Sequence, residues 1–227
     1  MNLTKIYIDS FQKEYLQEPY NLYIETYKNK ILPVFLNVEE EAHNIAKNCF
    51  KDMGKHINPD TCDPADLADR AWEKGLDYYQ GMILMRYNSQ LMWISTLYQF
   101  WEQQVRCFIF EEVSRNFRRV NFKSFCNSGI KDIRKQFQRF GIDINELNSW
   151  PDINELRLLT NVIKHGDGNA AAELEKMKPE YFRNNFDDSL IKFYGTSLNY
   201  KTINVLDSDF YRFCNDLILF WDELALK

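Results

Sequence analysis

Apolar residues recur at helical spacing through the longest stretch of the chain without a proline, residues 65–117. The apolar positions that carry this pattern are Met82, Met85, Met92, Leu97, Trp101, Val105 and Phe108. Spacings of three and four residues place them on one side of a helix. The pattern predicts a long central helix, which Gly81 can interrupt, and we interpret its methionine and aromatic residues as core packing.

A second amphipathic segment follows Pro151, where Leu156, Leu159, Val162 and Ile163 repeat at three- and four-residue intervals. This spacing predicts a helix over residues 151–165 with one buried face. A glycine comes directly after the segment, at the position where a left-handed residue commonly ends a helix.

Weaker patterns predict the other elements. Residues 1–32 indicate a peripheral helix that Pro33 interrupts, and residues 35–53 indicate a second helix that ends near Gly54. A loop with two prolines at residues 58–64 is the best domain boundary. We therefore divide the chain into an N-terminal helical extension, residues 1–60, and a helical domain, residues 61–227.

The C-terminal half predicts shorter helices and one long connection. Helices are expected over residues 129–140, where Asn127 and Ser128 can provide the cap, and over residues 169–177. Residues 180–206 lose helical periodicity, with a short extended piece expected at 201–205, and residues 208–226 carry a broad apolar stripe. These elements predict an all-α helical bundle in which the 65–117, 151–165 and 208–226 helices are neighbours.

Composition agrees with a globular helical protein. The chain of 227 residues is 45% apolar and 15% aromatic, with few glycines and prolines. Its five cysteines form no Cys-x-x-Cys pair, and we expect them to be reduced core residues. Because the sequence shows neither a leader nor a long uncharged apolar segment, we expect a cytoplasmic protein without a membrane segment.

Charge is unevenly distributed. The net charge of −5 provides no global attraction to nucleic acid, yet residues 113–141 contain eight basic residues and one acid. This concentration can contact RNA phosphates, or it can be a solvated helix face. The candidate RNA-binding residues in it are Arg115, Arg118, Arg119, Arg134, Lys135 and Arg139.

Two polar side chains interrupt the apolar pattern of the long helix. Glu102 and Arg106 lie within the stretch that is otherwise apolar. They can point inward and pair with other polar groups, or they can be exposed. We keep them as candidate supporting residues of a site.

The 151–165 segment also carries a polar row, because Arg157, Asn161 and His165 follow one another at intervals of four residues. This row can be a solvated face, with Lys164 and His165 as charges that favour a helix C-terminus. It can also be a site, since histidine transfers protons near neutral pH and arginine grips phosphate oxygens. Those two groups together suit phosphodiester cleavage.

The stretch Leu156-Arg157-Leu-Leu-Thr-Asn161-Val-Ile-Lys164-His165-Gly166, in an all-helical chain, resembles the motif of the HEPN superfamily. Many of its members are metal-independent, dimeric helical ribonucleases of toxin-antitoxin and phage-defence systems, with the motif helices facing each other. The family signature is an arginine, often followed by a polar residue, then four to six further residues and then a histidine. Here seven residues separate Arg157 from His165, and Asn161 lies between them.

The resemblance implies a catalytic role for Arg157, Asn161 and His165, attraction of RNA by Lys164, and a homodimer. It also implies an antitoxin or another defence-system protein as a partner. We find no phosphate-binding glycine loop, zinc-binding helix or nucleophile elbow, so we expect neither a cofactor nor a metal site. The alternative is a non-catalytic helical module that binds RNA or a protein.

Overall fold

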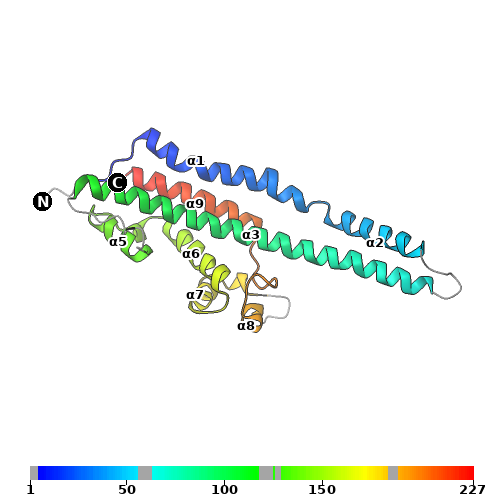
Figure 1. Cartoon of the computed structure of the whole chain (residues 1–227). Coiled ribbons are helices and arrows are strands. Elements are labelled where there is room, and N and C mark those ends of the chain that lie inside the picture. Colours follow the sequence, from blue (N-terminus) through cyan, green and yellow to red (C-terminus); the bar gives the residue numbers. More distant parts are fainter. Residues whose placement is uncertain (1–4, 56–62, 118–124, 126–128, 184–188) are drawn as a thin grey trace. The chain divides into compact units, whose positions relative to one another are not determined.

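The computed structural model describes residues 5–55, 63–117, 125, 129–183 and 189–227. These residues are predominantly helical and contain no strand, which confirms the all-α prediction (Figure 1). The α-helices are α1 (Ser10–Thr26), α2 (Val38–Gly54), α3 (Pro64–Asn116), α5 (Ile130–Gln138), α6 (Trp150–His165), α7 (Asn169–Met177), α8 (Leu190–Tyr194) and α9 (Asp207–Ala225). Shorter elements are the π-helix η1 (Tyr27–Ile31) and the 3₁₀-helices η2 (Leu32–Phe35), η3 (Ile144–Glu146) and η4 (Pro179–Tyr181).

The chain forms two compact units. The larger unit consists of residues 1–25 and 90–227, and the smaller unit consists of residues 26–89. This division differs from the predicted boundary near residue 60, because α1 belongs to the larger unit. Tyr20 in α1 is fully buried, and its hydroxyl donates to the Gln104 Oε1 atom of α3 over 2.5 Å. The first helix is therefore part of the core and not peripheral.

An aromatic core joins α3 and α9 in the larger unit, where Figure 1 shows α9 running beside the second half of α3. The rings of Trp101 and Phe220 pack edge to face at 5.3 Å, as do those of Phe108 and Trp221. Burying a large apolar side chain contributes about 1.5 to 3 kcal/mol. Since α9 also packs against α6, the three helices that the sequence predicted to be neighbours are joined through α9.

A carboxylate from α9 caps the N-terminus of α6. Glu223 accepts hydrogen bonds from the Ser149 N–H at 3.0 Å, the Ser149 hydroxyl at 2.7 Å and the Asn148 N–H at 2.8 Å. Burial alone would raise the pKa of Glu223, but these hydrogen bonds outweigh it and lower the pKa. Pro151 lies in the first turn of α6, where backbone N–H groups have no partner within the helix, so the N–H that proline lacks is not missed.

The C-terminus of α6 ends at Gly166, as the sequence predicted. Gly166 has a φ of +70°, and its N–H donates to the Val162 carbonyl over 2.8 Å. The backbone of Gly195 lies so close that a Cβ on Gly166 would meet the Gly195 oxygen at 2.2 Å. The Ser197 hydroxyl donates to the Ile163 carbonyl over 2.9 Å. The glycine is needed both for its φ and for this close approach.

Several local predictions need correction. Helix α3 continues through Gly81, because glycine is tolerated in a helix whose neighbouring residues favour it. Residues 201–205 do not form a strand, and the predicted irregular connection 180–206 includes η4 and α8. The predicted cap at Asn127 and Ser128 lies outside the described residues.

The cysteines depart in part from the prediction of core residues. Cys214 is buried, and burial raises the pKa of its thiol. Cys49 is half-buried and Cys107 is exposed. These three are free thiols, whereas Cys62 and Cys126 lie outside the part of the chain that the structure describes.

We expect Gly166→Ala to lower the free energy of unfolding by at least about 2 kcal/mol, since it combines an unfavourable φ with a backbone clash. Gly81→Ala is the control, because a Cβ there meets no atom within 4 Å. It should stabilise the exposed helix interior by about 0.5 to 1 kcal/mol. Denaturant unfolding measures both changes, and equal effects would contradict the predicted close approach.

Candidate functional site

The structure separates the ends of the polar row on α6. Arg157 and Asn161 are half-buried, whereas Lys164 and His165 are exposed at the end of the helix. The Arg157 Nε atom donates to Asn154 Oδ1 over 3.0 Å, one turn nearer the N-terminus. This bond turns the Arg157 guanidinium away from His165, which lies eight residues, or about 12 Å, farther along the same helix.

The same Arg157 belongs to a cluster of polar residues in the larger unit. We call this set the Tyr98 cluster: Tyr98, Glu102 and Arg106 from α3, Arg134 from α5 and Arg157 from α6. Tyr98 is 6% exposed, and its hydroxyl donates to Glu102 over 3.4 Å. Arg106 lies 3.4 Å from the other Glu102 oxygen. The structure thus brings together four of the residues that the sequence singled out.

Electrostatics show that the charges in this cluster influence one another. Burial and then the Glu102 charge raise the pKa of Tyr98, while the charges of Arg157 and Arg106 oppose this shift. Burial and then the Arg157 charge lower the pKa of Arg134. The positive charges of Arg134 and Arg157 repel each other, so an anion bound between them would be favoured.

The cluster has more hydrogen-bond donors than its neighbours accept. The Nε atoms of Arg106 and Arg134 are buried and have no hydrogen-bond partner among the described residues. The guanidinium of Arg134 also stacks 4.4 Å from the centre of the Trp150 ring. Three half-buried arginines therefore lie around Tyr98, with Glu102 beside Arg106 and the charge of Asp143 acting on Arg134. Guanidinium groups are well suited to hold phosphate oxygens.

The other basic candidates do not join this cluster. Arg115 is 2.7 Å from Glu112 and 3.2 Å from Glu111, so two carboxylates offset its charge. Lys135 pairs with Asp132 at 3.1 Å, and the Arg139 guanidinium lies 3.8 Å from the Phe117 ring centre. Arg118 and Arg119 lie outside the described residues.

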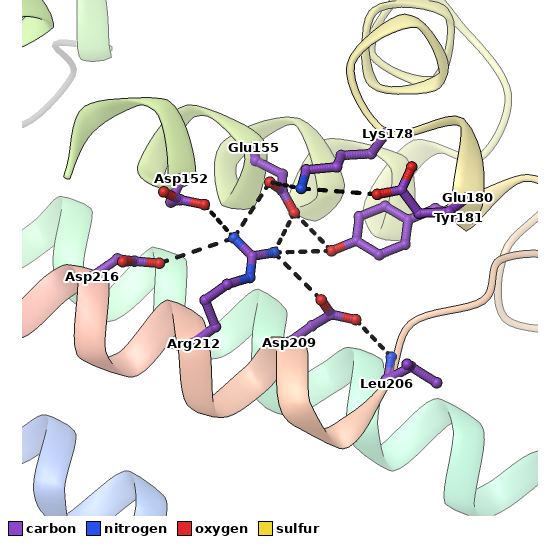
Figure 2. Close-up of polar contacts among 9 residues, drawn as sticks. All are labelled: Asp152, Glu155, Lys178, Glu180, Tyr181, Leu206, Asp209, Arg212 and Asp216. Carbon is purple, nitrogen blue, oxygen red and sulfur yellow. Dashed lines mark hydrogen bonds and ion pairs between the residues drawn. The ribbon is translucent and has the colours of Figure 1, made fainter. Parts of the chain in front are cut away.

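The largest ionic network among the described residues was not predicted from the sequence. It is the Arg212 cluster, in which Arg212 of α9 lies among Asp152 and Glu155 of α6 and Asp209 and Asp216 of α9 (Figure 2). Arg212 bonds to Asp152, lies 2.5 Å from Glu155 and 3.4 Å from Asp209, and is 4.0 Å from Asp216. Asp209, Arg212 and Asp216 share one helix face, which was the available signal.

Two further residues complete the Arg212 cluster around Glu155, whose side chain is only 2% exposed. The Tyr181 hydroxyl donates to Glu155 over 2.7 Å, and Lys178 lies 3.4 Å from its other oxygen. Burial raises the pKa of Tyr181, and the bond to Glu155 raises it further. A buried carboxylate needs such partners, so the cluster fixes α6, η4 and α9 to one another.

Asp216 is the weakly compensated member of the Arg212 cluster. Its Oδ2 atom is buried, with no hydrogen-bond partner among the described residues, and the side chain is 18% exposed. Burial and then the charge of Asp152 raise its pKa to about 6, although Arg212 opposes the shift. Relative to the unfolded chain, folding therefore favours the protonated form of this carboxyl group.

Comparison with known proteins identifies no relative, because no family model, curated protein or solved structure matches the chain. Within the described ranges, no helix has both the length and the apolar character needed to cross a membrane. No group of three or more His, Cys, Asp and Glu side chains among those residues could hold a metal ion.

The Asp216 pKa predicts a pH-dependent effect of Asp216→Asn. The folded pKa of about 6 lies above the ordinary 3.8, so native stability falls as pH rises between those values. At pH 7, Asp216→Asn should therefore raise the free energy of unfolding by about 1 to 3 kcal/mol. The gain should vanish below pH 4.

Asp222→Asn on the same helix is the matched control. Asp222 is 40% exposed and pairs with Lys13 at 2.9 Å. Loss of such a surface pair changes stability by about 0 to 1 kcal/mol. Denaturant unfolding at several pH values makes the comparison, and a pH-independent effect of Asp216→Asn would contradict the assigned pKa.

Proposed function

We propose that this protein is a metal-independent RNA endonuclease of a toxin-antitoxin or phage-defence system, with a HEPN-like helical domain. The observation that carries the proposal is the Tyr98 cluster, in which three arginines lie near a buried tyrosine and outnumber the nearby acids Glu102 and Asp143, in a chain of net charge −5. A local excess of guanidinium groups suits the phosphates of RNA, because each phosphate carries a negative charge. Arg157 connects this cluster to the helix that ends in the exposed His165.

The reaction that these side chains suit is attack of the RNA 2'-oxygen on the adjacent phosphorus. The 2'-hydroxyl loses a proton, the P–O5' bond breaks, and the leaving 5'-oxygen gains a proton. His165 performs one of these proton transfers, Asn161 orients the phosphate, and Arg157 stabilises the negatively charged phosphorane. The products are a 2',3'-cyclic phosphate and a 5'-hydroxyl.

The complete catalytic site combines two copies of the chain in this proposal. In one chain, the Arg157 guanidinium points away from His165, and the residues are about 12 Å apart along α6. Two antiparallel α6 helices related by a two-fold axis would place Arg157 of one copy beside His165 of the other. Lys164 is exposed next to His165 and adds positive charge at the rim.

A second candidate function is RNA or protein binding without cleavage. The bond from Arg157 to Asn154 favours it, because a guanidinium held in this direction serves binding in the Tyr98 cluster without any contribution from His165. This module would retain the salt-sensitive RNA affinity of the arginines, and an antitoxin could be its protein partner. RNA cleavage assays separate the two candidates.

We expect His165→Ala to reduce RNA cleavage by at least about 100-fold, because general acid-base catalysis typically contributes about 100- to 10,000-fold. The exposed imidazole can be removed without a loss of core packing. Asp167→Ala, at an exposed position just beyond the helix, is the control. Products are resolved by gel electrophoresis, and their 2',3'-cyclic phosphates are detected by mass spectrometry.

Chelation and mixing complete this test. EDTA should leave cleavage intact, whereas equal cleavage by wild type and His165→Ala would exclude the proposed role of the histidine. Mixing inactive Arg157→Ala and His165→Ala proteins should restore activity if two chains share a site. Each mixed dimer then has one site with both an intact Arg157 and an intact His165. An absence of recovery would reject the composite site.

A separate prediction concerns RNA binding by the Tyr98 cluster. Arg134→Ala should weaken binding and reduce the slope of log K against log salt by about 0.7, the value for one phosphate contact to a single strand. Arg115→Ala should have a smaller effect, because Glu111 and Glu112 already pair with Arg115. Fluorescence anisotropy with labelled RNA measures both, and a larger effect of Arg115→Ala would reject this assignment.

A further inference from the structure

Helices α2 and the first part of α3 form an antiparallel hairpin within the smaller unit. A Cβ on Gly75 would lie 2.7 Å from the Ala42 carbonyl oxygen, so the two helix backbones approach closely at this point. The Tyr78 hydroxyl donates to Glu41 over 2.6 Å. The two contacts, Gly75 with Ala42 and Tyr78 with Glu41, show that the helices are antiparallel and define their register.

The hairpin has a thin core of its own. Among its described residues, the buried ones are few, and four of the seven have small side chains: Tyr27, Val38, Ala42, Leu67, Ala71, Gly75 and Tyr87. Large apolar side chains remain exposed, including Trp72 at 62%, Met85 at 60% and Phe50 at 42%. Helices in proteins derive most of their stability from packing of an apolar face, and the described residues of this hairpin leave several large apolar side chains available to a partner.

One face of the hairpin combines two helical rows, which we call the hairpin face. The row on α2 consists of Glu39, His43, Ala46 and Phe50, and the row on α3 consists of Trp72, Leu76, Tyr79 and Ile83. Positions at i, i+4, i+7 and i+11 lie on one side of a helix. Six of these eight side chains line a shared hollow of about 270 Å³.

The dimensions of the hollow favour protein side chains as its occupants. Pockets for small molecules usually measure about 300 to 1,000 Å³, so this hollow is below that range. Its lining combines the small residues Ala42, Ala46 and Gly75 with the large side chains of Trp72 and Tyr79. Such a groove accepts large side chains from another helical surface.

Charge along α2 makes this surface complementary to itself. Glu39, Glu40 and Glu41 lie in the first turn of α2, whereas Lys47 and Lys51 lie in its second half. A second α2 that runs in the opposite direction would place its lysines beside these glutamates. A different partner would need its own matching charge gradient, whereas a second copy has it by symmetry.

We propose that the hairpin face binds the hairpin face of a second copy of this chain, forming a four-helix bundle with a two-fold axis perpendicular to the helices. Each helix then faces its symmetry mate in antiparallel orientation. Because Gly75 lies level with Ala42 and Ala46, the axis that places Glu40 opposite Lys51 at the rim passes near residues 73 and 74 of α3, so Trp72 of one copy packs near Trp72 of the other. This interface does not depend on the proposed nuclease activity.

The size of the surface predicts a weak, concentration-dependent dimer. A 17-residue helix is about 25 Å long and two neighbouring helices are about 20 Å wide, which gives about 1,000 Å² of total buried surface. That value is near the lower limit for a specific interface. Trp72 is the largest exposed side chain of the face and should be its main anchor.

The first test is sedimentation velocity of the full chain over a range of micromolar concentrations. We expect a reversible dimer, and Trp72→Ala should raise its dissociation constant by at least about 30-fold, the loss that defines an anchor residue. Phe193→Ala is the matched control, because Phe193 is an 81% exposed aromatic residue in the larger unit. It should leave the dissociation constant unchanged.

The second test reverses the charges at the rim. Glu40→Lys and Lys51→Glu should each weaken the dimer, because each creates like charges across the proposed interface. The double variant should restore the dissociation constant toward that of wild type, since it exchanges the charges in both symmetric pairs. The two residues are three turns apart in one helix, so they cannot restore each other within a single chain.

Three outcomes would overturn the proposal. They are a monomer at all concentrations, self-association whose size and affinity Trp72→Ala leaves unchanged, and a double charge variant no tighter than the single variants. Circular dichroism confirms that each variant keeps its helices. A hairpin-mediated dimer that does not cleave RNA would reject the proposed nuclease activity but not the hairpin interface. Cleavage by a strict monomer would reject the hairpin interface and the composite site but not the nuclease activity.

Discussion

Two charged side chains of α9 hold α6 in place, and the candidate site depends on this restraint. Glu223 accepts hydrogen bonds at the N-terminus of α6, and Arg212 binds Asp152 and Glu155 one turn farther along. Because Glu155 is almost fully buried, removing its partners would leave a charge in a medium of low polarity. That penalty opposes any rotation of α6 about its axis.

The orientation of α6 determines which polar residues meet. With Glu155 toward α9, Arg157 lies on the side of α6 that approaches Tyr98 and Arg134. His165, two turns farther along, reaches the exposed end of the helix at Gly166. Arg157, the member of the Tyr98 cluster on α6, and the exposed imidazole of His165 are thus separated along that helix. A second copy could bring the two groups together.

The two proposals place different demands on the structure. Phosphate binding needs the half-buried arginines of the larger unit, whose charges Glu102 only partly offsets. Self-association of the hairpin needs apolar residues of the smaller unit, which its thin core leaves exposed. Neither demand conflicts with the aromatic packing of Trp101 and Phe220 that stabilises the larger unit.

The sequence by itself determined the helical class, the extents of α2, α6 and α9, and the end of α6 at Gly166, because these follow from local periodicity and backbone preference. The pairs of Arg115 with Glu112 and of Arg157 with Asn154 also have local helical spacing. Only the tertiary structure decided that Arg134 of α5 and Arg157 of α6 meet near Tyr98 of α3. It also created the Arg212 cluster from residues 57 and 60 positions apart. Helical spacing identifies the face on which a residue lies, but the partner on that face depends on which distant helix packs there.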